Sequence, residues 1–210
     1  MEQSHYVELN PKNIEARSFE IITSELGHLH LDETIAPIIK RVVHTTADFD
    51  YARITEVHPQ AIAAATSALS KGCRIYTDTR MIIAGVSKPA LKKWNSSVYT
   101  FVDDDDVIAK SKEQGITRSI LGIDKTMESE LPAIYVIGNA PTALVRIYEL
   151  IEAKKISPAL VIGVPVGFVG ASESKELMRK TDIPYIITQG RKGGSTVAVA
   201  ILNALLYMVK

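Results

Sequence analysis

Short apolar runs alternate with stretches of helical spacing from Ile54 onward, and this alternation constrains the fold more than any other feature of the chain. Apolar strands separated by helices are typical of a parallel sheet whose two faces are both covered. The sequence therefore predicts an α/β protein with a doubly wound, mainly parallel sheet and helices on both faces. The expected strands span residues 54–57, 74–77, 98–102, 133–137, 160–163 and 185–188. The expected helices span residues 61–69, 81–94 with a break at Pro89, 107–120, 144–153, 174–179 and 197–207.

An N-terminal helical segment, residues 1–52, precedes this α/β core, residues 53–210. A chain of 210 residues that is 46% hydrophobic can bury one sizeable core. We therefore expect a single domain, residues 1–210.

Two helices are expected in the N-terminal segment. Asn10 followed by Pro11 is typical of a helix start, and Gly27 ends that helix. Asp32 is expected to cap the second helix, which leads to His44. Its apolar residues recur at helical spacing and predict a face that packs into the core: Ile35, Ile38, Ile39, Val42 and Val43.

His44 is the candidate catalytic residue. It ends this apolar pattern among hydroxyls and carboxylates, in the run Val43-His44-Thr45-Thr46-Ala47-Asp48. An imidazole titrates near neutral pH, so a fixed one can donate or accept a proton under physiological conditions. A histidine at the end of an apolar helix is also common as a capping or core residue, and the residues alone leave that alternative open.

The composition argues against a nucleic-acid partner, an internal disulfide and a membrane span. Lysine plus arginine equals aspartate plus glutamate at 24 each, which disfavours nucleic acid as a partner because nucleic acid needs a net basic face. The single cysteine, Cys73, has no partner for an internal disulfide, and no apolar stretch approaches the length of a membrane span. No leading segment resembles a signal peptide. We expect a cytoplasmic protein without a membrane partner.

No metal site is predicted. His28 and His30 are two residues apart, but no third ligand follows at a recognisable spacing, so an exposed loop is favoured. The acidic run from Asp103 to Asp106 is more typical of a solvated helix start. Cys73 is expected to be a small buried residue beside the 74–77 strand rather than a catalytic thiol.

Three glycine-rich loops follow expected strands, at residues 138–142, 163–170 and 190–195. Glycine lets a backbone approach a ligand closely, and each loop leads into a helix whose first N–H groups can hold an anion. A plain strand-to-helix turn is an equally good reading of the first two loops. The third loop adds the cations Arg191 and Lys192.

Known nucleotide and hydrolase motifs do not fit these loops. The glycines of residues 163–170 have the spacing G-x-x-x-G-x-x-G, which is not the dinucleotide fingerprint. In residues 190–195 the lysine precedes the paired glycines, whereas in a phosphate-binding loop it follows them. The hydrolase motif G-x-S-x-G is absent from the sequence. An ordinary nucleotide-binding enzyme is therefore disfavoured.

Four blocks together resemble the precorrin-8X methylmutase family, which includes the cobalt-precorrin-8 methylmutases, over nearly the whole chain. They are VHTTADFD from Val43, GNAPTAL from Gly138, PVGFVGA from Pro165 with Glu173-Ser174-Lys175, and GRKGGS from Gly190. The resemblance implies an isomerase of cobalamin biosynthesis that moves a methyl group from C11 to C12 of the corrin ring, giving hydrogenobyrinate or cobyrinate. It also implies an α/β/α homodimer with its active sites near the subunit interface, and no added cofactor.

In this family the histidine at the position of His44 is taken as a proton donor or hydrogen-bond partner to a ring nitrogen. Such a group suffices because a methyl shift on a conjugated ring needs a biased electron distribution and no nucleophile. The ring is a broad apolar disc with peripheral carboxylates, so we expect cations and helix starts around an apolar slot. The expected substrate-binding residues are Arg17, Ser18, Thr45, Thr46, Arg118, Asn139, Gly167, Phe168, Arg191, Lys192, Gly193, Gly194 and Ser195.

Two questions stay open from the sequence. A non-catalytic corrinoid carrier could use the same slot, and it is the alternative to the isomerase. The substrate could be precorrin-8X or cobalt-precorrin-8, and any cobalt would arrive as part of the substrate rather than as a cofactor.

Overall fold

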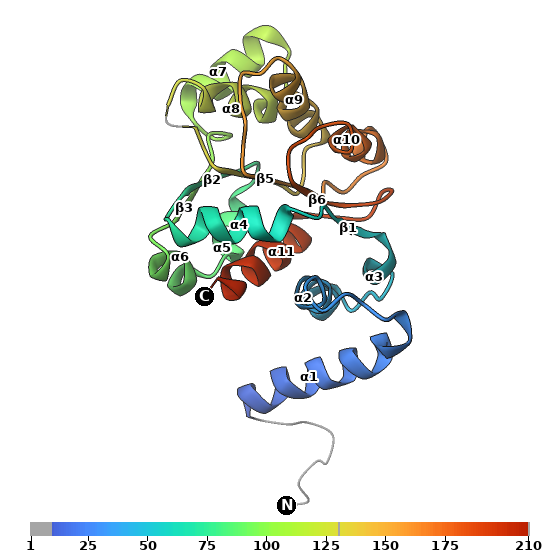
Figure 1. Cartoon of the computed structure of the whole chain (residues 1–210). Coiled ribbons are helices and arrows are strands. Elements are labelled where there is room, and N and C mark those ends of the chain that lie inside the picture. Colours follow the sequence, from blue (N-terminus) through green and yellow to red (C-terminus); the bar gives the residue numbers. More distant parts are fainter. Residues whose placement is uncertain (1–9, 130, 210) are drawn as a thin grey trace, which may run out of the picture.

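The computed structural model describes residues 10–129 and 131–209, in which a six-stranded sheet runs through the middle of the molecule (Figure 1). The strand order is β1-β6-β5-β4-β2-β3. Strand β1 is antiparallel to β6, and all other neighbouring strands are parallel. The strands are β1 Thr55–Val57, β2 Arg74–Thr77, β3 Ser97–Tyr99, β4 Ile134–Ile137, β5 Leu160–Gly163 and β6 Tyr185–Thr188. The predicted α/β class with a mainly parallel sheet is confirmed.

Helices cover both faces of the sheet (Figure 1). One layer contains α7 Asp105–Gln114, α8 Arg118–Thr126, α9 Pro141–Glu152 and α10 Ala171–Met178. The opposite layer contains α4 Ala61–Ser70, α5 Arg80–Gly85, α6 Lys88–Lys93 and α11 Ser195–Met208. The N-terminal segment adds α1 Pro11–Leu26, the 3₁₀ turn η1 Gly27–Leu29, α2 Ala36–Thr46 and the short α3 Tyr51–Ile54. Helix α2 packs against α11, and α1 lies farther from the sheet than α2 (Figure 1).

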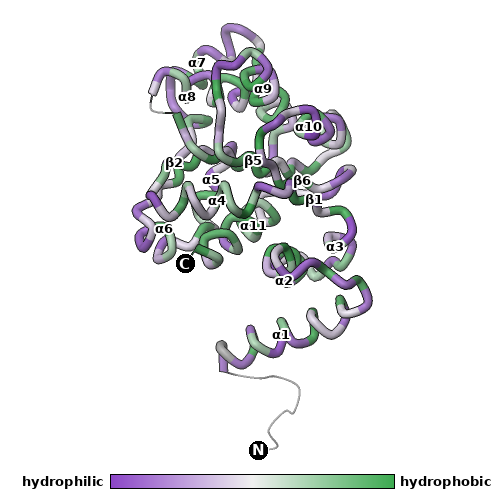
Figure 2. Tube along the Cα trace, viewed as in Figure 1, coloured by the Kyte–Doolittle hydropathy of each residue, from purple (hydrophilic) through white to green (hydrophobic). Residues whose placement is uncertain are grey.

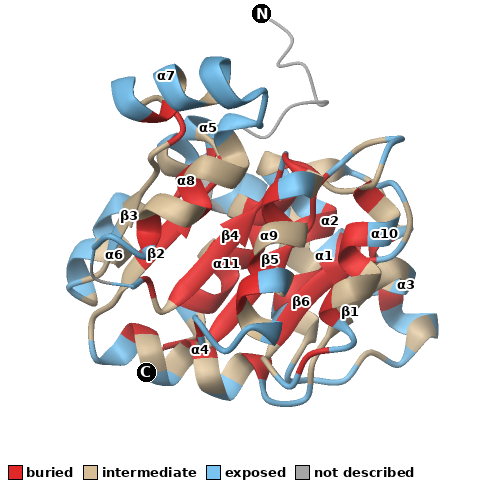
Figure 3. Cartoon of the chain, turned by 90° about the horizontal axis from the view of Figure 1, so that it is seen from above, coloured by how far each residue is buried: buried red, intermediate tan, exposed pale blue. Residues whose placement is uncertain are grey.

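The central strands are buried on both faces, as Figure 3 shows. Successive side chains of a strand point to opposite faces, so Ile134 and Val136 join the core under α2 and α11, whereas Tyr135 and Ile137 join the core under α9. Helix α11 is apolar along most of its length (Figure 2) because it is covered by α2, α4 and α5. Among the described residues, no helix combines the length and apolarity that crossing a membrane requires.

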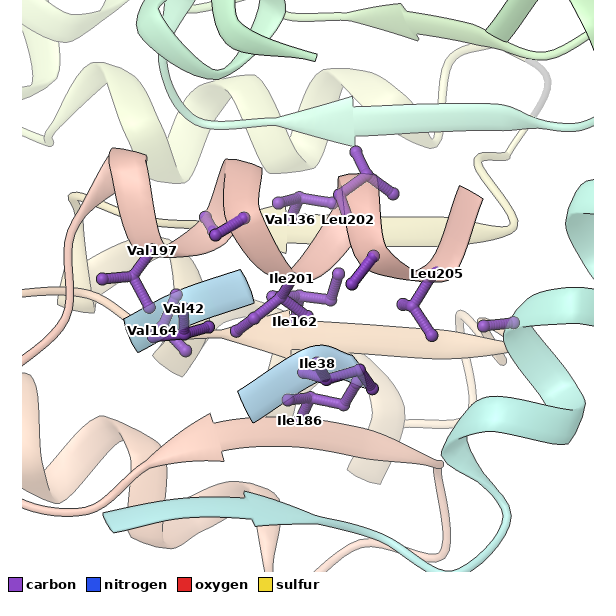
Figure 4. Close-up of a cluster of buried hydrophobic side chains, with 14 of the residues drawn as sticks. Ile38, Val42, Val136, Ile162, Val164, Ile186, Val197, Ile201, Leu202 and Leu205 are labelled. Atoms are coloured by element: carbon purple, nitrogen blue, oxygen red, sulfur yellow. The ribbon is translucent and has the colours of Figure 1, made fainter. Parts of the chain in front are cut away.

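The expected apolar face of α2 is confirmed except at Ile35, which precedes the helix and is only half-buried. Four of its residues are at most 1% exposed: Ile38, Ile39, Val42 and Val43. Figure 4 shows Ile38 and Val42 against the β5 and β6 side chains and α11. Burial of each such side chain contributes about 1.5–3 kcal/mol. The packing therefore fixes the position of the helix that ends just after His44.

Several predicted element boundaries were wrong. The expected helix over 107–120 is two helices, because Gly115 takes a left-handed conformation (φ 66°) after α7 and the Thr117 hydroxyl then caps α8. The Asp32 carboxylate accepts the Thr34 N–H at 2.7 Å, which makes a turn, and α2 starts only at Ala36. The expected strand over 98–102 ends at Tyr99, at the edge of the sheet. The break predicted at Pro89 falls just before it, where Ser87 caps α6.

The chain reverses its winding between β2 and β4, which are neighbours in the sheet. After β2 the chain enters α5 in one layer, and after β4 it enters α9 in the other (Figure 1). The two loops therefore diverge from adjacent strand ends, and such a switch point is where open α/β sheets commonly bind ligands.

Candidate functional site

The glycine-rich loops after β5 and β6 pack directly against each other. The Gly194 N–H donates to the Val164 carbonyl at 2.8 Å, and the Gly167 N–H donates to the Arg191 carbonyl at 3.2 Å. A Cβ on Gly193 would lie 2.2 Å from the Val164 carbonyl oxygen. This glycine is required by contact between two backbones, and not by the approach of a ligand.

The loop after β4 joins the same assembly. A Cβ on Gly138 would lie 2.8 Å from the Cα of Ser195 at the start of α11. The Ser195 hydroxyl lies 3.1 Å from that of Thr79, which follows β2. The structure thus brings residues 138, 167 and 193–195 together at the carboxyl ends of the parallel strands, as the pattern of strands predicted. This end of the sheet is called its edge below.

An exposed apolar surface with a cation above it lies at this edge. Phe168 is 83% exposed and Val169 is 89% exposed, and the Arg191 guanidinium lies 5.3 Å from the centre of the Phe168 ring. Beside this loop, an open groove of about 480 Å³ runs between α8 and α9. Its apolar lining comes from Ile116, Ile120, Pro141, Val145 and Val169. The predicted combination of apolar surface and positive charge is present in the structure.

Lys192 is held by carboxylates of the segment that follows His44. Its ammonium donates to Asp48 at 2.5 Å and to Asp50 at 2.8 Å. The hydrogen bond from Lys192 lowers the pKa of Asp48, and the bonds to Asp48 and Asp50 raise the pKa of Lys192. The sequence did not reveal this pairing, which ties the α2–α3 connection to the loop after β6. Lys192 is consequently a partly neutralised cation.

His44 lies in the last turn of α2 with its side chain exposed, stacked on Phe19 of α1. The two ring centres are 5.0 Å apart and the rings are inclined by 14°. The hydroxyls of Thr45 and Thr46 donate to the carbonyls of Arg41 and Val42 in their own helix. These bonds shape the helix end, and it is Phe19 that contacts the imidazole.

Asp78 is a residue of this edge that sequence reasoning missed. It follows β2 and is 3% exposed, and its carboxylate accepts the N–H groups of Gly138 at 3.0 Å, Asn139 at 2.9 Å and Ala140 at 2.7 Å. Burial raises the pKa of Asp78, against the opposite effect of these three bonds. The backbone N–H groups of the loop that leads into α9 therefore bind a carboxylate of the protein itself. A lone carboxylate directly after a buried strand was the signal for it.

Of the remaining predicted residues, Asn139 belongs to the loop after β4, whereas Arg17, Ser18 and Arg118 lie on helices. Arg118 begins α8, where it donates to Asp103 at 3.2 Å. Arg17 and Ser18 lie on α1, where Arg17 pairs with Glu20. The Asn139 side chain is exposed. In one chain, therefore, His44 and Arg118 lie in opposite layers of the molecule (Figure 1).

The motifs considered for metal binding have other roles in the structure. His28 and His30 are exposed. Asp104 and Asp106 lie at the start of α7, as expected for a helix start. Both accept hydrogen bonds from Lys125 of α8. Within residues 10–129 and 131–209, no three histidine, cysteine, aspartate or glutamate side chains are grouped as a metal ion would require.

Comparison with known proteins places this geometry in a family. A cobalt-precorrin-8 methylmutase of Leptospira interrogans is 49% identical over 205 residues, which cover 94% of this chain and 93% of that protein. A cobalt-precorrin-8 methylmutase of Salmonella typhimurium is 42% identical and covers 98% of this chain and 99% of its own length. The crystal structure of a precorrin-8X methylmutase from Thermus thermophilus superimposes with a TM-score of 0.88 at 36% identity, over 94% of this chain and 96% of that chain.

These relatives carry the name of an enzyme, so the predicted isomerase is confirmed and the carrier is not favoured. The family model described as precorrin-8X methylmutase matches residues 13–208. The chain belongs to the precorrin-8X methylmutase family.

Proposed function

We propose that this isomerase acts on cobalt-precorrin-8 and moves the methyl group from C11 to C12 of the corrin ring, giving cobyrinate. Relatives at 49%, 43% and 42% identity all bear the cobalt-precorrin-8 name, which favours the cobalt-containing substrate over precorrin-8X. The single observation that carries the proposal is the exposed apolar loop of Phe168 and Val169 with Arg191 above it. A corrinoid is an apolar disc with carboxylates at its rim, so it matches this surface in both respects.

His44 is proposed as the acid that protonates or hydrogen-bonds a ring nitrogen. In the shift, the bond from the methyl group to C11 breaks as the bond to C12 forms, and both ends stay within one conjugated system. The protein therefore has to bias the electron distribution of the ring without supplying a nucleophile. An exposed imidazole on a helix fixed by core packing, and stacked on Phe19, is suited to that task. We propose that no added cofactor takes part and that the cobalt belongs to the substrate.

The test compares His44→Ala with His30→Ala, which removes another exposed histidine. We expect His44→Ala to lower kcat by about 10²–10⁴-fold, which is the usual contribution of a general acid, while cobyrinate binding persists. His30→Ala should behave like the unchanged protein. Absorption spectra of purified protein with excess cobalt-precorrin-8 report turnover, whereas a carrier would give only a stoichiometric shift. Normal turnover by His44→Ala would remove the proposed role.

Arg191 is proposed to bind a peripheral carboxylate of the ring. The ion pairs among the described residues do not include Arg191, unlike Lys192. Arg191→Gln should weaken cobyrinate binding by roughly three- to tenfold and reduce its dependence on salt. The matched control is Lys180→Gln, which removes an exposed charge after α10. If both variants bind cobyrinate alike at low and high salt, Arg191 is only a surface charge.

A homodimer is also proposed, with α1 as part of the interface. Ile14 and Ile21 on α1 are 45% and 44% exposed, and Tyr207 on α11 is 54% exposed. A hollow of about 570 Å³ lies between α1, α2 and the end of α11. Exposed apolar residues on a helix at the periphery are typical of an interface. A partner subunit could bring its Arg118 or Arg17 to the site from which they are separated in one chain.

Light scattering after size-exclusion chromatography tests the dimer. Ile14→Asp combined with Ile21→Asp should give a monomer, because the two residues share one face of α1. Thr23→Asp places one charge on the opposite face and should leave the mass unchanged. A dimer that survives both changes would place the interface elsewhere. The cytoplasmic location remains a prediction.

A further inference from the structure

Lys175 is a buried lysine that neither the fold nor the proposed chemistry explains. It lies on α10 with 0% of its surface exposed. Its ammonium donates to the Lys192 carbonyl at 2.9 Å and to the Thr188 hydroxyl at 3.2 Å. The same hydroxyl donates to the Lys192 carbonyl at 2.7 Å. Lys175 is therefore anchored beneath the loop that carries Arg191 and Lys192.

The Lys175 ammonium donates its hydrogen bonds only to neutral oxygens, and the charge of Glu176, the next residue along the chain, acts on it without a direct contact. None of the ion pairs among the described residues includes Lys175. Glu176, the next residue along the chain, pairs with Arg179, and the carboxylates of Asp48 and Asp50 pair with the exposed ammonium of Lys192. Burial lowers the pKa of Lys175 to about 8.

A buried ammonium is costly, and the local structure does not need it. The Lys192 carbonyl would still accept the Thr188 hydroxyl if Lys175 were apolar. Replacing a buried charge by an apolar side chain of similar size is often neutral or stabilising. Stability of the loop therefore does not account for the cation.

We propose that Lys175 is a positioning residue for substrate: it holds the loop of Arg191 and Lys192 from below, and a substrate carboxylate bound at that loop adds a negative charge above an ammonium that has no ion pair of its own. This inference relies on the proposed function, because it assumes a polyanionic corrinoid at this loop. The exposed cations meet the substrate from solution, whereas Lys175 acts through the loop backbone without touching the ring.

The test uses cobyrinate, the product of the proposed reaction, with Lys175→Met and Thr188→Val. Lys175→Met should weaken cobyrinate binding about tenfold, because the variant loses both the buried charge and the bond that holds the loop. Its melting temperature should be unchanged or higher. With cobalt-precorrin-8, KM should rise while kcat stays within about twofold, since His44 is untouched. Thr188→Val keeps the charge and should bind cobyrinate nearly as the unchanged protein does.

Three results would overturn the inference. Cobyrinate affinity of Lys175→Met within about twofold of the unchanged protein would show that the charge is not used. Equal weakening in Lys175→Met and Thr188→Val would show that only the hydrogen-bonded tether matters. A lower melting temperature with unchanged KM would show a purely structural role. If Lys175→Met does not fold, Lys175→Gln, which keeps a donor but no charge, answers the same question. Failure of the unchanged protein to bind cobyrinate would instead refute the proposed function.

Discussion

Replacing Asp78 by asparagine tests how the edge of the sheet is held together. The carboxylate has two oxygens for three N–H groups: one accepts from Gly138, and the other accepts from both Asn139 and Ala140. Asparagine offers one oxygen and one NH₂ group in the same space. In its best orientation it keeps the two bonds to Asn139 and Ala140, and its NH₂ group then faces the Gly138 N–H.

The expected loss of stability follows from this count. An unsatisfied buried N–H costs about 1–3 kcal/mol, and two bonds to a charged acceptor become bonds to a neutral one, each weaker by roughly 1 kcal/mol. Relief of the buried charge offsets part of that cost. We expect Asp78→Asn to lower the free energy of unfolding by about 2–3 kcal/mol at pH 7, which corresponds to roughly 4–12 °C in melting temperature for a chain of this length.

Urea unfolding of Asp78→Asn measures this loss, with Asp182→Asn as the control. Asp182 is exposed, so its replacement should change the free energy of unfolding by less than about 0.5 kcal/mol. Hydrogen exchange adds a local readout, because the Gly138 amide, which loses its acceptor, should lose protection before those of Asn139 and Ala140. If Asp78→Asn is as stable as the control, the three N–H groups must have other partners and the reasoning is wrong.

The pH dependence gives a second check on Asp78. Because burial raises its pKa in the folded state, its contribution is fully present below its unfolded pKa of about 4 and is lost as the pH rises through the folded pKa. Asparagine does not titrate. The stability difference between the two proteins should therefore be larger at acidic than at alkaline pH, and a difference that grows with rising pH would contradict the expected shift.

Three further predictions concern two contacts of the site and one ion pair outside it. Gly193→Ala should lower the free energy of unfolding by about 1–3 kcal/mol, measured in urea, because the new methyl group would displace the main chain that follows β5. It should also weaken cobyrinate binding. If neither quantity changes, Gly193 does not approach the Val164 carbonyl as closely as the structure shows. Phe19→Ala should lower kcat with little change in KM, because His44 loses the ring on which it stacks, and steady-state kinetics would show the opposite split if the stack served binding. The hydrogen bond from Arg179 lowers the pKa of Glu56 in the folded protein. The contribution of Glu56 to stability is therefore fully present above its unfolded pKa of about 4.3 and is lost as the pH falls through its folded pKa. Glu56→Gln should flatten the fall in stability on acidification, and a parallel fall in both proteins would exclude the lowered pKa.

The sequence predicted the fold well where burial dictates residue type. The central strands are apolar because helices cover both faces, so β4, β5 and β6 were visible as short apolar runs. The apolar spacing of α2 likewise predicted that His44 ends a packed helix. Strand order and the antiparallel β1 were not predictable, because pairing depends on contacts far apart in the sequence.

Glycine was the least reliable guide to the site. The glycine-rich loops suggested backbone approaching a ligand, whereas Gly138 and Gly193 are needed where one loop touches another. A sequence pattern shows that a residue without a side chain is required but not what occupies the space. The long-range bonds of Asp78 and Lys192 were hidden for the same reason, since their partners lie 60 or more residues away along the chain.

The pairing of the cations has a consequence for how a polyanion would bind. Arg118 contacts Asp103, Arg17 contacts Glu20, and Lys192 contacts Asp48 and Asp50, all as partly exposed pairs. Such pairs are worth about 0–1 kcal/mol each, so a substrate carboxylate can replace a protein carboxylate at little cost. Preformed pairs also hold the long side chains near their places before substrate arrives. The site would therefore exchange partners on binding, and the apolar disc, rather than net positive charge, would supply most of the affinity. That division is consistent with a chain whose acidic and basic residues balance at 24 each.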